Sequence, residues 1–109
     1  MTAKAIDTPW GPAQEVKHVG EGVTWYSTAS HGGFHVDAER MKQMPSRFRE
    51  FKPWAGRGWY EEDADWAVVC LSFPELFSEK DRAAATETLE IVSREYFENQ
   101  GVKFEEVQP

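Results

Sequence analysis

Two histidines and a block of carboxylates are the residues of this sequence whose types and spacing could support chemistry. His31 and His35 lie on either side of a Gly-Gly pair, at a predicted turn between strands. Four carboxylates follow within five positions: Glu61, Glu62, Asp63 and Asp65. Two imidazoles and a carboxylate suit zinc or iron, which makes His31, His35, Glu61 and Asp63 candidate metal ligands. The H-x-x-x-H spacing crosses a glycine turn and lacks the Glu of a zinc-protease helix, so it is a weak metal signal.

A hydrolytic site is the second chemical interpretation. Its possible nucleophiles are Ser27, Ser30 and Cys70. His31 would be the base and Asp63 the group that orients it, so these two are the candidate catalytic residues. The sequence contains no G-x-S-x-G nucleophile elbow, and adjacent residues of a strand point to opposite faces, which separates Ser30 from His31. The pattern therefore favours a binding protein over an enzyme.

The acidic block also has a purely structural interpretation. If residues 61–65 are helical, Glu61 and Asp65 lie one turn apart and repel each other unless a cation intervenes. Six basic residues precede the block, between Arg40 and Arg57. We therefore expect an internal acidic–basic clamp in preference to a divalent-cation site, with His31 bonded to the carboxylates. The preferred interpretation includes no cofactor.

Charge is distributed unevenly along the 109 residues, which carry −7 in total. Residues 1–39 hold two basic and five acidic side chains, a net charge of −3. Residues 40–58 hold six basic and one acidic side chain, a net charge of +5. Residues 59–109 hold four basic and thirteen acidic side chains, a net charge of −9. This balance disfavours direct nucleic-acid binding, although segment 40–57 could form a local basic patch. The acidic C-terminal half favours docking on a basic surface of a partner protein.

The compartment is expected to be cytoplasmic. The longest apolar run, residues 66–71, has six residues, whereas a membrane helix needs about 20. No secretory leader is recognisable in the sequence. The single cysteine, Cys70, cannot form an internal disulfide and is expected to be buried. Because the apolar runs are short, we also expect no membrane contact.

Trp54 is the candidate anchor of a protein interface. It lies in the Pro- and Gly-containing segment 52–58, beside Arg49 and Arg57. Trp and Arg dominate the energetics of protein interfaces. The candidate binding residues are Trp54, Arg57, Trp59, Glu61, Glu62, Asp63, Asp65 and His31.

The elements that must position these residues follow from periodicity. Three β-favouring segments predict strands over 13–19, 23–29 and 34–36, joined by glycine-containing turns in an antiparallel meander. Asp37 is the predicted N-cap of a short helix over 38–44, which must end before Pro45.

Two further helices are predicted in the C-terminal half. Residues 61–73 fit either a helix or a buried strand, and the apolar spacing favours a helix that begins at the acidic block. A long helix is predicted over 79–99, with Ser78 as N-cap and Gly101 as its end. Its expected buried residues are Ala85, Leu89, Val92 and Tyr96, with Ile91 and Phe97 beside them.

Together these elements predict an α+β fold. An N-terminal antiparallel meander packs against a long C-terminal helix and one or two shorter helices. The length predicts a single domain over 1–109, with an irregular arm at 1–12, the meander at 13–36 and a mainly helical part at 37–109.

Two motifs occur together, WYSTASHGGFHV at 25–36 and GWYEEDADWAVV at 58–69, followed by Phe73-Pro74. They resemble a small domain of unknown function found in bacterial plasmid and phage proteins, over most of residues 20–97. The resemblance implies a compact α+β domain of mobile-element origin and assigns no catalytic residues. We expect a small acidic accessory protein that binds a host protein, such as the inhibitor of a defence nuclease system. The alternatives are a small metal-dependent hydrolase or nucleotide-modifying enzyme centred on His31, His35 and residues 61–65, and a structural or regulatory domain.

Overall fold

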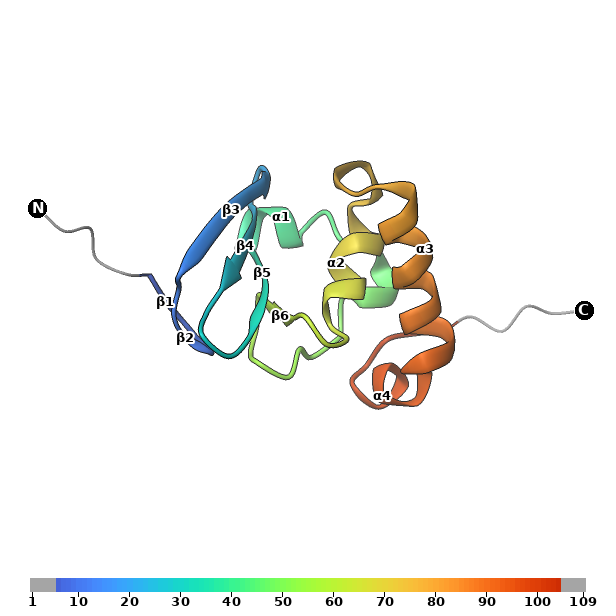
Figure 1. Cartoon of the computed structure of the whole chain (residues 1–109). Helices are drawn as coiled ribbons and strands as arrows, with labels where there is room; N and C mark the ends of the chain where they lie inside the picture. The colour runs from blue at the N-terminus through green and yellow to red at the C-terminus, as the bar shows by residue number, and fades with distance from the viewer. Residues whose placement is uncertain (1–5, 105–109) are drawn as a thin grey trace, which may run out of the picture.

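The computed structural model describes residues 6–104, in which a sheet and a group of helices lie side by side (Figure 1). The main sheet is antiparallel, with the strand order β3-β4-β5-β6. Its strands are β3 (Glu15–Gly20), β4 (Val23–Ser27), β5 (Gly32–Val36) and β6 (Trp59–Glu61). A small hairpin pairs β1 (Asp7–Thr8) with β2 (Gly11–Pro12), within the arm predicted to be irregular. The predicted α+β class is confirmed.

The predicted meander forms, and side chains alternate between its two faces. Trp25 lies opposite Phe34, and Phe34 lies opposite Tyr60, so the three rings share the face that packs against the helices. The β3–β4 turn contains Gly22 at φ 76°, a conformation that side chains with a Cβ rarely adopt. β6 is an additional strand in the part of the chain predicted to be mainly helical. It pairs with β5 because segment 52–58 returns the chain to the sheet.

The helical elements are α1 (Ala38–Met41), η1 (Ser46–Phe48), α2 (Trp66–Ser72), η2 (Pro74–Leu76), α3 (Glu79–Glu87), η3 (Thr88–Val92) and α4 (Arg94–Asn99). Both predicted N-caps are confirmed: the side chain of Asp37 accepts a hydrogen bond from the backbone N–H of Arg40, and that of Ser78 from the N–H of Asp81. α1 is shorter than the predicted 38–44. The chain leaves the helix through tight turns before Pro45, which disfavours helical backbone in the preceding residue.

Residues 61–73 are helical only from Trp66 onward. Glu61 ends β6, and residues 62–65 form a turn. The predicted position of the acidic block at the start of a helix is therefore wrong, because pairing with β5 holds residues 59–61 extended. α2 itself is the apolar segment, and it buries Ala67, Val68, Val69 and Cys70 completely. The predicted burial of Cys70 is confirmed.

The predicted long helix over 79–99 is interrupted. α3 passes into η3, a π-helical turn, and the backbone breaks at Ser93 (φ −122°) before α4 begins. The β-branched residues Thr88, Ile91 and Val92 are crowded in a regular helix, which is consistent with a local departure from it. The wider turn rotates the helix face. Ala85, Leu89 and Phe97 are buried as predicted, whereas Ile91 and Val92 are 75% and 69% exposed.

The hydrophobic core lies between the sheet and the helices. α2 occupies its centre, because it contacts β5 and β6 on one side and α3 on the other. Side chains from the η1 segment, including Phe48 and Phe51, close the core between the two layers. No helix in the described part of the chain is long and apolar enough to cross a membrane.

Candidate functional site

Trp54 lies on a loop whose backbone is held in place while its side chain faces solvent. The indole is 74% exposed, as the sequence predicted. Its backbone N–H donates to a carboxylate oxygen of Asp65 at 3.0 Å. The start of the loop is joined to the end of α4, because the N–H of Lys52 donates to the carbonyl of Gln100 at 2.8 Å and the Gln100 side chain donates to the carbonyl of Lys52 at 2.9 Å. Hydrogen bonds therefore hold in place the backbone that carries the exposed Trp54 side chain.

A cavity of about 220 Å³, here called the acidic cavity, lies beside Trp54. The residues that line it come from the loop, the end of β6, the following turn and the start of α4: Trp54, Glu61, Asp63, Ala64, Asp65, Ser93 and Tyr96. Four of the predicted binding residues are thus brought together in space. The turn after β6 places them there, in place of the predicted helix.

Asp65 is a buried carboxylate that connects two segments of this site. It is 2% exposed, and its two carboxylate oxygens accept hydrogen bonds from Trp54 N–H and from the Tyr96 hydroxyl, the latter at 2.6 Å. Burial raises the pKa of Asp65, and the two hydrogen bonds oppose that rise by stabilising the ionised form. Burial and the bond to Asp65 also raise the pKa of the Tyr96 hydroxyl. Asp65 is therefore a structural carboxylate that joins the Trp54 loop to α4.

Glu61 is the second perturbed carboxylate of the acidic cavity. Burial raises its pKa first, and the neighbouring Asp63 carboxylate raises it further. His31, on the adjacent turn, opposes the rise through its charge. Like charges gathered in a hollow attract a cationic group, so the acidic cavity is suited to a Lys or Arg side chain of a partner.

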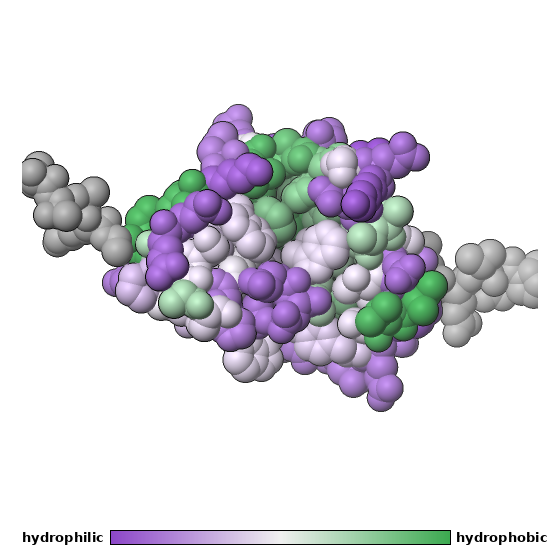
Figure 2. Space-filling view, viewed as in Figure 1, coloured by the Kyte–Doolittle hydropathy of each residue, from purple (hydrophilic) through white to green (hydrophobic). Residues whose placement is uncertain are grey.

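The π-helical turn carries two exposed apolar residues shortly before a residue that lines this cavity. Ile91 and Val92 directly precede Ser93, which lines the acidic cavity, and both are largely exposed. Figure 2 shows strongly hydrophobic surface on the helical side of the molecule, in the lower right of the view. Exposed apolar residues such as Trp54, Ile91 and Val92 are typical of protein-binding surfaces.

The candidate metal ligands are not brought together. Among residues 6–104, no three His, Cys, Asp or Glu side chains are placed to hold a metal ion. His35 lies over the ring of Trp59, with ring centres 4.5 Å apart, and burial lowers its pKa. His31 is exposed on the β4–β5 turn. That turn is closed by Thr28 and not by the His31 side chain, because the Thr28 hydroxyl bonds to the backbone of residue 31.

The predicted acidic–basic clamp is also not formed. Within the described residues, the ion pairs are Arg40–Glu75, Lys42–Glu39, Arg94–Glu98 and Lys103–Glu50, and none includes a carboxylate of residues 61–65.

The other candidate binding residues lie outside the acidic cavity. Trp59 is half-buried on the outer face of the sheet, where its ring packs against Trp10 and Tyr26. Its role is therefore in packing. Glu62 is exposed in the turn after β6. Arg57 does not line the acidic cavity either.

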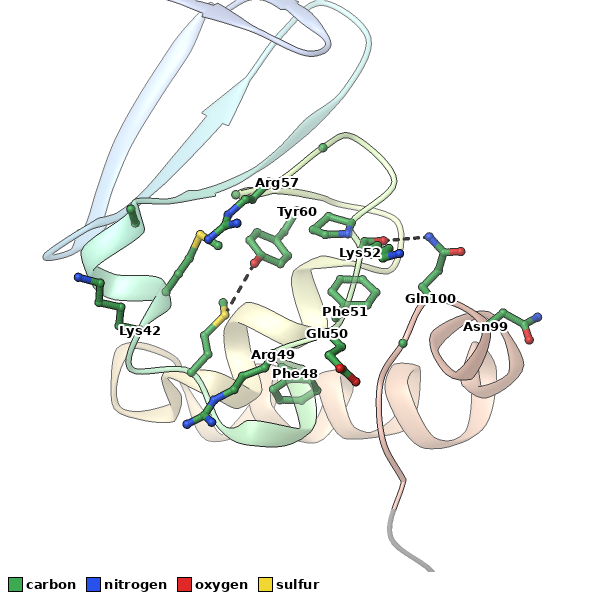
Figure 3. A pocket seen from close by; sticks show the side chains of 17 residues that line it. Lys42, Phe48, Arg49, Glu50, Phe51, Lys52, Arg57, Tyr60, Asn99 and Gln100 are labelled. Carbon is green, nitrogen blue, oxygen red and sulfur yellow. Dashed lines mark hydrogen bonds between the residues drawn. The ribbon is translucent and has the colours of Figure 1, made fainter.

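Arg57 lines a second and larger hollow, here called the basic groove, of about 1150 Å³ (Figure 3). Its walls come from α1, η1, the 52–58 loop and residues 99–101. The sequence indicated a basic patch over 40–57 but gave no sign of a groove. Tyr96 and the exposed residues Ile91 and Val92 were assigned to the buried side of a helix, and no local signal marked them as part of a site.

Searches among curated proteins and among solved structures each found no significant match to this chain. A family whose description is Domain of unknown function (DUF7007) matches residues 3–108, nearly the whole length. The sequence resemblance to a domain of unknown function is confirmed to that extent, and the chain belongs to this family.

Proposed function

We propose that this chain is a protein-binding module that uses the surface around Trp54. This surface, called the Trp54 face, consists of Trp54, Glu61, Asp63, Ile91 and Val92. One observation carries the proposal: the Trp54 side chain is 74% exposed, while its backbone N–H is held by a buried carboxylate. An exposed indole on a fixed backbone loses little conformational freedom on binding, which favours affinity.

The energetic contribution of Trp54 can be estimated from its area. An aromatic side chain buries on the order of 150–250 Å². At about 25 cal/mol per Å², this corresponds to roughly 4–6 kcal/mol of gross stabilisation in a complex. Part of that gain is lost to the general costs of association, so a truncation effect of about 2 kcal/mol or more is expected.

The charge of the Trp54 face defines the partner. Glu61 and Asp63 line the same cavity as Trp54, and the intervening Glu62 is exposed. A partner with an apolar pocket edged by Lys or Arg would complement this surface. Proteins that handle nucleic acid carry such basic surfaces. The resemblance to plasmid and phage proteins makes a host defence nuclease the partner class that we propose, with inhibition as the outcome of docking.

Affinity capture from a bacterial host lysate tests the proposal. Wild type, Trp54→Ala and Val16→Ala are immobilised and compared. Val16 is a matched control because it is 50% exposed and apolar but lies on β3, away from the Trp54 face. We expect one stoichiometric partner that wild type and Val16→Ala retain and that Trp54→Ala binds at least about 30-fold more weakly.

Salt dependence supplies the second measurement. Affinity for the captured partner should fall as ionic strength rises, because exposed charges on both proteins are screened. A captured nuclease is then assayed for cleavage with and without the protein. Retention of the partner by Trp54→Ala, or affinity that does not change with salt, would refute the proposal.

A further inference from the structure

The basic groove concentrates positive charge on a protein whose total charge is −7. Four cationic side chains line it: Lys42, Arg49, Lys52 and Arg57. All four residues are exposed. In the view of Figure 3, Arg57 and Lys52 lie on either side of Tyr60, with Arg49 and Lys42 farther out. Lys42 directly follows α1, Arg49 directly follows η1, and the other two belong to the 52–58 loop.

Most of this charge is not neutralised by ion pairs among the residues that the structure describes. Lys42 pairs with Glu39 at 3.1 Å, but both side chains are largely exposed, so the pair is weak. No carboxylate among residues 6–104 forms an ion pair with Arg49, Lys52 or Arg57. The lining residue Glu50 pairs with Lys103, at 3.3 Å. The groove is therefore suited to an anionic ligand.

The floor of the groove is apolar and closed. Met44, Phe48, Phe51 and Tyr60 are each between 3% and 7% exposed, and the Tyr60 hydroxyl is directed at the sulfur of Met44, 3.7 Å away. A floor of low dielectric focuses the field of the surrounding cations. The burial of these rings also means that they offer no exposed face on which a nucleobase could stack, which single-stranded nucleic acids require.

The walls of the groove are fixed before a ligand arrives. The two hydrogen bonds between Lys52 and Gln100 join the loop to the end of α4, and the N–H of Lys103 donates to the carbonyl of Arg47 at 3.1 Å. Gly101 has a φ of 99°, and a Cβ there would lie 2.4 Å from the carbonyl oxygen of Glu50, so the two walls are in close contact. Binding would require little reorganisation of the backbone.

We infer that the basic groove binds an acidic peptide segment of a partner protein. Arginine clusters recognise such segments through charge-assisted, often bidentate hydrogen bonds to carboxylates. Asn99, an exposed amide on the groove edge, can donate to and accept from peptide groups. A nucleic acid is the less suitable polyanion, because its bases find no stacking surface in the groove.

The probe for the test is a fluorescein-labelled peptide of ten glutamates, titrated by anisotropy at pH 7 and low salt. Arg49→Gln combined with Arg57→Gln removes two groove cations. Lys17→Gln combined with Lys80→Gln is the matched control, since it removes the same net charge from exposed positions outside the groove. All four positions are exposed, and urea unfolding of both double variants confirms that they fold.

We expect saturable binding by wild type that weakens about tenfold in the groove variant and less than about twofold in the control. Trp54→Ala should still bind the peptide. The test of the basic groove is therefore independent of whether the Trp54 face binds a partner. The inference is overturned if wild type does not bind the peptide, if both double variants lose affinity equally, or if an oligothymidylate of equal charge binds more tightly than the peptide.

Discussion

Removal of one hydroxyl group, by Tyr96→Phe, tests whether the buried Asp65 carboxylate holds the Trp54 loop and α4 together. The Tyr96 hydroxyl donates to Asp65 at 2.6 Å, and Asp65 is 2% exposed. The variant keeps the aromatic ring and its packing, but it leaves one oxygen of a buried carboxylate without that donor. A hydrogen bond to a charged group contributes about 1.5–3 kcal/mol, so we expect unfolding to become easier by about 2 kcal/mol.

The effect can be measured by urea denaturation at pH 7 and by thermal unfolding. For 109 residues, an unfolding entropy of about 2.1 cal/mol/K per residue converts 2 kcal/mol into a decrease in melting temperature of about 9 °C. Tyr26→Phe is the matched control. Tyr26 is half-buried against Trp59, and among the described residues its hydroxyl makes no hydrogen bond, so its loss should cost less than about 0.5 kcal/mol. Equal effects of the two substitutions would refute the role assigned to Asp65.

The pH dependence provides an independent check with a defined sign. Burial raises the folded-state pKa of Asp65 above its unfolded value, so ionised Asp65 costs stability at neutral pH. That cost decreases as pH falls through the folded-state pKa and is gone below the unfolded-state pKa. Tyr96→Phe removes a bond that favours the ionised form, so it raises this pKa further. The difference in unfolding free energy between wild type and Tyr96→Phe should therefore be largest at pH 7 and decrease on acidification. A difference that grows toward low pH would contradict the argument.

The remaining predictions concern the helix interruption, the sheet and the cysteine. Leu89→Ala should lower the unfolding free energy by about 2–5 kcal/mol, because Leu89 is buried, whereas Val92→Ala should change it by less than about 0.5 kcal/mol, because Val92 is largely exposed. A large cost for Val92→Ala in urea unfolding would show that the helix is continuous. Gly33→Ala should lower the unfolding free energy by about 2 kcal/mol or more in the same assay, because a Cβ there would lie 2.4 Å from the Trp10 ring and 2.5 Å from a backbone oxygen. An unchanged unfolding free energy would exclude this packing. Cys70, fully buried and with a pKa raised to about 11, should resist iodoacetamide at pH 7.5 until denaturant is added; rapid labelling of the native protein would place it at the surface.

Several features of the fold follow from local sequence signals. The β-favouring segments separated by glycine turns predicted the meander, since alternation of side chains between two faces is a property of each strand by itself. Asp37 and Ser78 were identified as N-caps because the capping bond spans only three residues of chain. The exposure of Trp54 and the burial of Cys70 followed from their immediate neighbours, a Pro- and Gly-containing loop and an apolar run.

Other features depend on partners that are distant in the sequence. Residues 59–61 became a strand because β5 supplies hydrogen-bond partners, and this pairing displaced the acidic block from the predicted helix. The hydrogen bond between Asp65 and Tyr96 joins positions 31 residues apart. The other carboxylate oxygen of Asp65 accepts from the N–H of Trp54 and so holds the backbone of this exposed residue in place. Local propensity contains no information about such contacts.

What the sequence by itself determined is therefore the class of fold, the location of its caps and turns, and the exposure of Trp54. The tertiary structure alone decided which of these residues meet. It separated His31 and His35 from a common metal site and gathered Trp54, Glu61 and Asp63 around one cavity. The physical reason is that a site is defined by distances between segments, and those distances are set only when the sheet and the helices pack on a shared core.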